Sequence, residues 1–199
     1  MKKLFLSFIF VLLFSSSTQS LTYNSNPEIF VTELIQDAIK TLSDKTITKE
    51  KKNKAIEKIA LENVDIYALG LYTLGDIRKT LEPTILSKYN KLFERYFLKS
   101  LTSRLTDYSS QRFEVTGSNQ KSASYTIVSS KIAKSSTQPE IKIDWRIYTK
   151  DPTKPLIRDL IVEGLSLART QKEEFASILN SNNKDINVLF SKLEEFISN

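Results

Sequence analysis

The spacing of apolar residues changes twice along the chain, and this change limits the fold more than any other sequence feature. Apolar residues recur at helical spacing from Pro27 to about Tyr108, and again after Thr170. Between about 113 and 164 they alternate with polar residues, most strictly over 141–148. Such alternation is typical of antiparallel strands with one buried face. Helices, then strands, then helices predict an α+β protein with about four antiparallel strands.

Local signals place the expected elements. Asn26–Glu28 is a helix start with an N-cap, proline and an acid, and Thr48 opens a second helix. Pro83 begins the longest helix, whose aromatic-rich stripe we expect to press against the sheet. Thr170 and Glu173 form a capping box for a C-terminal helix. Turns are expected at 117–119 and 149–155, and a flexible connection at 129–139.

The first residues have the pattern of an export signal. A basic start, Met1–Lys3, precedes a mostly apolar run over Leu4–Phe14, and Thr18–Ser20 fits a small-residue cleavage site. The apolar run is shorter than the ~20 residues of a membrane span. We expect cleavage near Ser20, with cleavage after Ser17 or an uncleaved anchor as alternatives. The chain then divides into a signal peptide (1–20), an N-terminal helical part (21–82), the long helix plus sheet (83–165), and C-terminal helices that complete a helical subdomain (166–199).

The composition excludes several kinds of chemistry. The 199 residues include no Cys and no His, so disulfides, a thiol nucleophile, an imidazole base and an ordinary zinc site are not expected. The formal net charge of +6 falls to +4 when Lys2 and Lys3 are removed with the signal. The sequence has no arginine-rich stripe of the kind that binds nucleic acid, so a nucleic-acid partner is not expected. An enzyme would depend on Asp, Glu, Lys, Tyr or Ser.

Two segments carry a family pattern. Asn63–Leu69 and Thr73–Arg78 match a first block, and Asp159–Leu167, followed by Phe175, matches a second and more specific one. With these blocks the chain resembles the MlaC/toluene-tolerance family of periplasmic phospholipid carriers, over about Pro27–Ile197. Three positions depart from the family pattern: Ile77 replaces a common Trp, Lys172 replaces Arg, and Arg158 replaces an aromatic or apolar residue.

The resemblance implies both a fold and a function. The fold would be a curved, nuclear-transport-factor-two-like antiparallel sheet packed against a long helix, with a helical subdomain. The protein would carry phospholipid in the periplasm between an outer-membrane lipoprotein complex and an inner-membrane ABC transporter complex with an MCE-domain protein. The family has no catalytic residues, no metal and no cofactor besides the bound lipid.

The expected site is an apolar cavity between the sheet and the long helix. Plain core packing is the alternative for each residue, and a one-residue shift of register would invert the strand faces. The residues predicted to bind lipid lie on the long helix and the strands: Phe93, Phe97, Ile127, Ile143, Trp145, Ile147, Leu160, Val162 and Leu165.

Polar residues in the motif blocks have structural and functional interpretations. Asp159 could act as an acid or base, but no His, Cys or second acid accompanies it, so we favour a structural carboxylate, as for Asp65 and Glu163. Ser166 lacks the spacing of an esterase nucleophile and is expected to cap a helix. Arg78 and Lys172 could contact lipid phosphate or an acidic partner, or be solvated surface charges. A small exported enzyme, or an interaction protein with a filled core, remains the alternative function.

Overall fold

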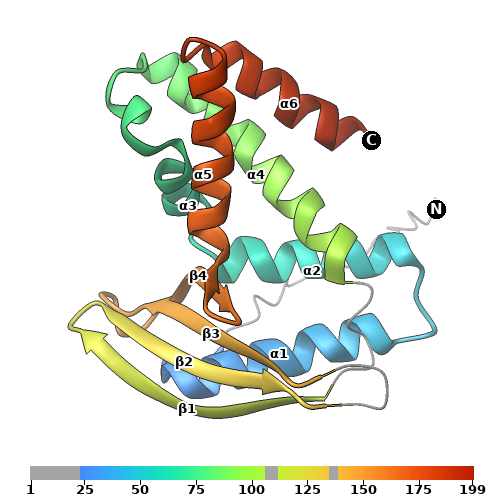
Figure 1. The fold of residues 1–199 in the computed structure, drawn as a ribbon. Coiled ribbons are helices and arrows are strands. Elements are labelled where there is room, and N and C mark those ends of the chain that lie inside the picture. Colours follow the sequence, from blue (N-terminus) through green and yellow to red (C-terminus); the bar gives the residue numbers. More distant parts are fainter. Residues whose placement is uncertain (1–22, 106–111, 135–138) are drawn as a thin grey trace, which may run out of the picture.

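The computed structural model describes residues 23–105, 112–134 and 139–199, and it confirms the predicted α+β class. A curved antiparallel sheet has one helix lying along it, and a second group of helices rises from its β4 side (Figure 1). The predicted signal peptide lies outside the described residues. Among those described, no helix has the length and apolar content to cross a membrane. The elements are α1 (Pro27–Ser43), α2 (Lys49–Asn63), α3 (Ile66–Leu74), the 3-10 helix η1 (Gly75–Lys79), α4 (Pro83–Leu105), β1 (Phe113–Ser122), β2 (Tyr125–Ile132), β3 (Ile141–Tyr148), β4 (Leu156–Val162), β5 (Leu165–Ser166), α5 (Leu167–Ser181) and α6 (Ile186–Ser198).

The described strands form one sheet in the order β1-β2-β3-β4-β5, with each strand antiparallel to its neighbour. β5 is a two-residue strand that the sequence did not predict. On β3 the predicted register is correct, because Ile143, Trp145 and Ile147 are buried. Their partners on β4 continue the same inner face, with Trp145 opposite Leu160 and Ile143 opposite Val162.

One predicted turn, part of the predicted flexible connection and one strand face are wrong, whereas the predicted turn at 149–155 is present. Residues 117–119 lie inside β1, where a bulge between Val115 and Gly117 takes up the irregularity. Gly117 has φ 146°, a backbone conformation that favours glycine. The strand β2 extends through residues 129–132 of the expected flexible connection. Its buried side chains include Val128 and Ile132, so Ile127 lies on the opposite face.

The apolar side chains form two separate cores. The sheet core joins the inner sheet face to α1 and α2, with Phe30, Ile56 and Trp145 among its buried members. The helical core joins α3, α4, α5 and α6 and contains the stacked rings of Tyr89 and Phe93. Hence the helix that packs along the sheet is α1. The expectation that the aromatic stripe of the helix beginning at Pro83 presses on the sheet is wrong, because this stripe packs inside the helical subdomain.

Candidate functional site

The sheet and the helical subdomain meet along β4, where the N-termini of α3 and α5 reach the strand. The bridge between Val64 and Ile157 is parallel, and the Asp65 N–H donates to the Ile157 carbonyl over 2.9 Å. Val64 packs against both cores. Further along the same edge of β4, the short strand β5 leads directly into α5. This junction is the candidate functional site because it holds the two halves of the molecule together.

Arg158 links β4 to α3. Both Nε and Nη2 of Arg158 donate to Oδ2 of Asp65, over 2.9 and 2.7 Å, and Nη1 donates to the Tyr125 hydroxyl over 2.7 Å. The guanidinium lies 3.5 Å from the ring centre of Tyr148. Burial opposes the charge, but the hydrogen bonds to Tyr125 and Asp65 hold the pKa of Arg158 above its usual value. Asp65 also accepts from the Ala68 N–H and so caps α3.

The next residue, Asp159, links β4 to α5. It is only 4% exposed, and its carboxylate accepts from the Ser166 hydroxyl over 2.6 Å and from the Ala168 N–H over 3.0 Å. Ser166 in turn caps α5 by accepting from the Arg169 N–H, as expected. The predicted capping box at Thr170 is wrong, since the Thr170 hydroxyl donates to the Ser166 carbonyl within the first turn. These contacts make Asp159 a structural carboxylate.

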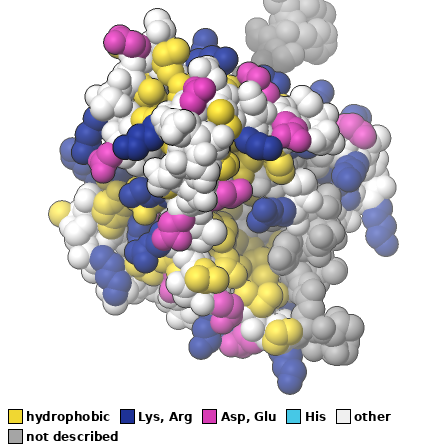
Figure 2. Space-filling view, turned by 45° about the horizontal axis from the view of Figure 1, so that its top comes forward, with side chains coloured by type: hydrophobic (Ala, Val, Ile, Leu, Met, Phe, Trp, Pro, Cys, Tyr) yellow, Lys and Arg dark blue, Asp and Glu magenta, His cyan; other side chains and the backbone are white. Residues whose placement is uncertain are grey.

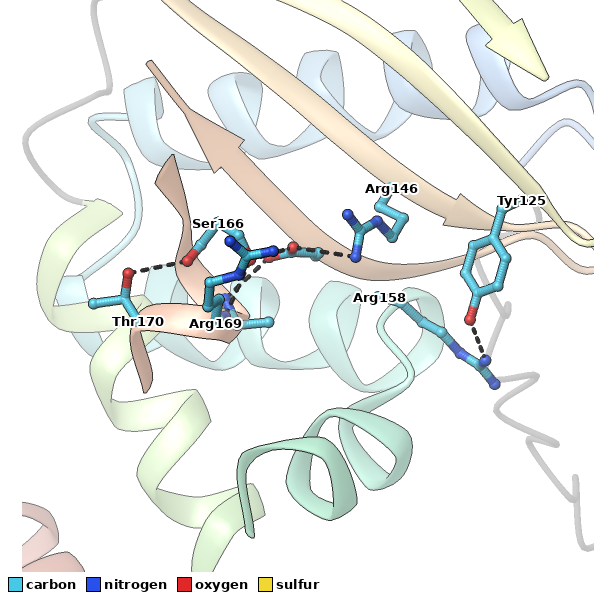
Figure 3. Close-up of polar contacts among 8 residues, drawn as sticks. Tyr125, Arg146, Arg158, Ser166, Arg169 and Thr170 are labelled. Carbon is cyan, nitrogen blue, oxygen red and sulfur yellow. Dashed lines mark hydrogen bonds and ion pairs between the residues drawn. The ribbon is translucent and has the colours of Figure 1, made fainter. Parts of the chain in front are cut away.

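A register shift in β4 explains how neighbouring residues serve two different helices. Asp159 pairs with Arg146, whereas Ile157 pairs with Ile147, so Arg158 is an extra residue in the ladder. A bulge of this kind redirects a side chain and bends the strand. In Figure 3, Arg146 lies between the start of α5, with Ser166 and Arg169, and the Arg158–Tyr125 pair. Nη1 of Arg146 is 3.7 Å from Oδ2 of Asp159.

Two pockets of about 210 and 250 Å³ open at this junction. Each is smaller than the ~300–1,000 Å³ of typical sites for drug-sized ligands. The first lies between α3, the start of α5 and the outer face of the sheet. The second lies where α2 meets α3, beside the turn before β4. Their lining residues are Ala68, Leu69, Tyr72, Tyr125, Arg146, Arg158 and Ala168 for the first, and Leu61, Glu62, Val64, Asp65, Ile66, Tyr67, Glu94, Lys154 and Leu156 for the second.

The structure divides the predicted lipid-binding residues among several places. Phe93 is buried in the helical core and Phe97 packs against it. Ile127 is half-buried on the outer sheet face, and Leu165 is 68% exposed in β5. The others share the sheet core, where Leu160 and Val162 are only partly buried. Those in the sheet core are Ile143, Trp145, Ile147, Leu160 and Val162.

Some junction residues were not found by sequence reasoning. Arg146 and Tyr148 lie on the predicted polar face of their strand and Tyr125 on the predicted apolar face of its own, and nothing in their spacing marks them as junction residues. Arg158 did carry a signal, because it departs from the family pattern just before Asp159. Arg78 and Lys172 were the two cations considered as contacts for lipid phosphate or an acidic partner. In the structure, Nη1 of Arg78 donates to the Gly75 carbonyl, and Nζ of Lys172 lies 5.2 Å from the ring centre of Tyr72. Within the described residues, no group of three or more Asp or Glu could hold a metal ion.

Replacing Arg158 with lysine should destabilise the protein by about 1–2 kcal/mol, although the charge is retained. A single ammonium cannot bond both Asp65 and Tyr125 while covering the Tyr148 ring. Urea denaturation of Arg158→Lys measures the loss, with Arg95→Lys on the exposed surface of α4 as the matched control. Equal stability of the two variants would contradict this role for Arg158.

An open antiparallel sheet with a helical subdomain joined to one of its strands places the protein among the small α+β proteins. Within that class, the chain belongs to the MlaC protein family, whose model matches residues 32–195. Its fold is similar to that of a phospholipid-binding protein from Ralstonia solanacearum, solved in complex with a phospholipid. The two are 17% identical, with a TM-score of 0.69 over 84% of this chain and 94% of the other. No curated protein sequence matches the chain. Family and fold together point to binding and transport rather than to enzymatic catalysis.

Proposed function

We propose that this protein is an exported periplasmic carrier that binds the acyl chains of a phospholipid between its two cores. It would shuttle lipid between an inner-membrane ABC transporter complex with an MCE-domain protein and an outer-membrane lipoprotein complex, and so maintain the lipid asymmetry of the outer membrane. The observation that carries this proposal is the family match over 32–195, supported by a structural neighbour that holds a phospholipid.

The arrangement of half-buried apolar residues supports a place for the acyl chains. Phe97 and Leu98 of α4 pack against the helical core, whereas Leu101, one turn further, packs against the sheet core. Leu160 and Val162 on the inner sheet face are also only partly buried. We call the boundary marked by these five residues the seam. Figure 2 shows hydrophobic side chains gathered in a hollow on one face.

The size of the ligand requires the seam to open. Two chains of about 16 carbons represent roughly 25 kcal/mol of gross apolar transfer at ~0.8 kcal/mol per methylene. That exceeds the ~18–21 kcal/mol at which non-covalent affinity saturates, so binding can supply the free energy of separating the two layers. The pockets at the junction, of about 210 and 250 Å³, are too small for a diacyl lipid without such a separation.

We expect protein purified from bacterial envelopes to contain phospholipid, detected by organic extraction and mass spectrometry. Protein stripped of lipid should take up labelled phospholipid from vesicles, with the intrinsic emission of Trp145 as a second readout, because this ring lies beside the seam. Repeated lipid-free preparations that also take up no labelled lipid would contradict the proposed function.

A small exported enzyme would need a free reactive group, and the carboxylate of Asp159 is already hydrogen-bonded.

A further inference from the structure

The excess positive charge of the chain is concentrated where α1 turns into α2. Residues 40–54 contain six lysines and only two acidic residues, Asp44 and Glu50. Outside this segment and the first 20 residues, basic and acidic side chains are present in equal numbers. The whole net charge of +4 that remains without Lys2 and Lys3 therefore belongs to these 15 residues.

The corner between α1 and α2 holds this segment in a defined shape. Asp44 accepts hydrogen bonds from the N–H and the hydroxyl of Thr46, over 2.7 and 2.6 Å, and Thr48 caps α2. Nζ of Lys52 donates to the Leu42 carbonyl in the last turn of α1. Figure 1 shows the corner projecting at one end of the molecule, where α1 and α2 are joined. The positive charges of the segment are therefore presented together on an ordered support.

The other five lysines of the segment are exposed to solvent. Among the residues that the structure describes, none of them forms a salt bridge or a side-chain hydrogen bond. Ammonium groups that lie close together without such partners create a positive potential that attracts anions. We call these five residues the lysine corner: Lys40, Lys45, Lys49, Lys51 and Lys54.

We propose that the lysine corner is a docking surface for a bilayer that contains anionic phospholipid. This inference rests on the proposed function, which places the protein between two membranes, and it adds the surface that meets them. Clusters of about four to eight basic residues on a helix are typical of segments that bind anionic headgroups. Lysine suits this task because its ammonium is a hydrated point charge on a flexible stem and needs no fixed partner geometry.

The composition of the segment favours a lipid surface over a protein partner. Residues 40–54 contain no arginine and no aromatic residue. Protein interfaces are enriched in exactly those side chains and depleted in lysine, and most of their binding energy comes from a few aromatic or arginine anchors. A bilayer instead offers many equivalent phosphates, and each lysine near them strengthens binding by a factor of about five.

Binding of the purified protein to vesicles tests the proposal. We expect sedimentation with vesicles of phosphatidylglycerol and phosphatidylcholine in equal parts at low ionic strength, but not with pure phosphatidylcholine. Binding should be lost at about 1 M salt, where the Debye length falls to about 3 Å. A variant that lacks four charges of the lysine corner should bind about 10²–10³-fold more weakly at low salt. Its substitutions are Lys45→Gln, Lys49→Gln, Lys51→Gln and Lys54→Gln.

The matched control loses the same number of charges at exposed lysines on other elements. It carries Lys91→Gln, Lys121→Gln, Lys150→Gln and Lys192→Gln, and it should retain most of the vesicle binding. Equal losses in the two variants would overturn the proposal, because net charge and not the lysine corner would then govern binding. Wild-type protein that ignores the anionic vesicles at low salt would also overturn it, and would leave the lysine corner to an acidic protein.

Lipid uptake separates this proposal from the proposed function. The variant at the lysine corner should still contain extractable phospholipid, because none of its substituted residues belongs to the seam, and this lipid also shows that the variant is folded. Wild-type protein that takes up lipid but does not bind anionic vesicles would refute the docking surface alone. Wild-type protein that binds these vesicles through the lysine corner but never takes up lipid would refute the proposed function and support the docking surface.

Discussion

Replacing Asp159 with alanine should lower the free energy of unfolding by about 3 kcal/mol, because the substitution removes a buried carboxylate that accepts two hydrogen bonds. The carboxylate of Asp159 holds the Ser166 hydroxyl at 2.6 Å and the Ala168 N–H at 3.0 Å. Ala168 is itself buried, so its N–H would lose a partner where water has little access. The first turn of α5 would lose its attachment to the sheet.

Guanidinium denaturation of Asp159→Ala measures this effect. The matched control is Asp151→Ala, which also removes a carboxylate that accepts two hydrogen bonds, from the Thr153 N–H and hydroxyl, but at an exposed position. We expect little change in the control, since water replaces lost bonds at the surface. A loss below about 1 kcal/mol at Asp159 would show that α5 does not depend on this anchor. A smaller denaturant slope would show instead that the helical subdomain had separated from the sheet in the folded protein, because less surface would then remain to be exposed on unfolding.

Hydrophobic periodicity was sufficient to predict most elements but not the faces of all strands. On β3 the buried and apolar positions coincide, so alternation gives the correct register. On β2 the inner face includes the polar residue Ser130, whereas the more apolar positions Tyr125 and Ile127 lie on the outer face. Apolar character alone therefore predicts the wrong face for this strand. Ser130 lies inward because its hydroxyl accepts from Trp145 Nε1 over 2.8 Å and donates to the Ile143 carbonyl. A buried polar network of this kind needs knowledge of the neighbouring strand, which a single sequence does not contain.

Periodicity also cannot decide which helix packs against the sheet. Both α1 and α4 have apolar stripes long enough to cover the inner sheet face, and the sequence does not rank them. The C-terminal helices resolve the ambiguity, because their own apolar stripes require a helical partner. Rings of Phe175 and Phe196 meet the Tyr96 ring of α4, which leaves α1 for the sheet. The contact of Arg158 with Asp65 was beyond prediction for a similar reason, since it depends on a bulge and joins residues 93 positions apart.

Replacing Phe93 with alanine should destabilise the lipid-free protein by about 4 kcal/mol, the usual effect of removing a buried phenylalanine. Phe93 is 3% exposed, and its ring contacts Tyr89, Phe97 and Phe175. The ring also fills the space over Gly70, where an added Cβ would lie 2.9 Å from a ring atom. Such close packing leaves no room for the surroundings to collapse, so most of the lost volume should remain as a cavity.

The same substitution separates core packing from a preformed lipid cavity at this position. Thermal or urea unfolding of lipid-free Phe93→Ala is compared with Phe196→Ala, which removes an equal side chain that is 38% exposed on α6. If Phe93 lined an open cavity, its removal would enlarge existing space, and the two variants would lose similar stability. A loss confined to Phe93→Ala, with lipid uptake per folded molecule unchanged, would assign the ring to the helical core. The acyl chains would then have to lie toward Leu160 and Val162, on the sheet side of the seam.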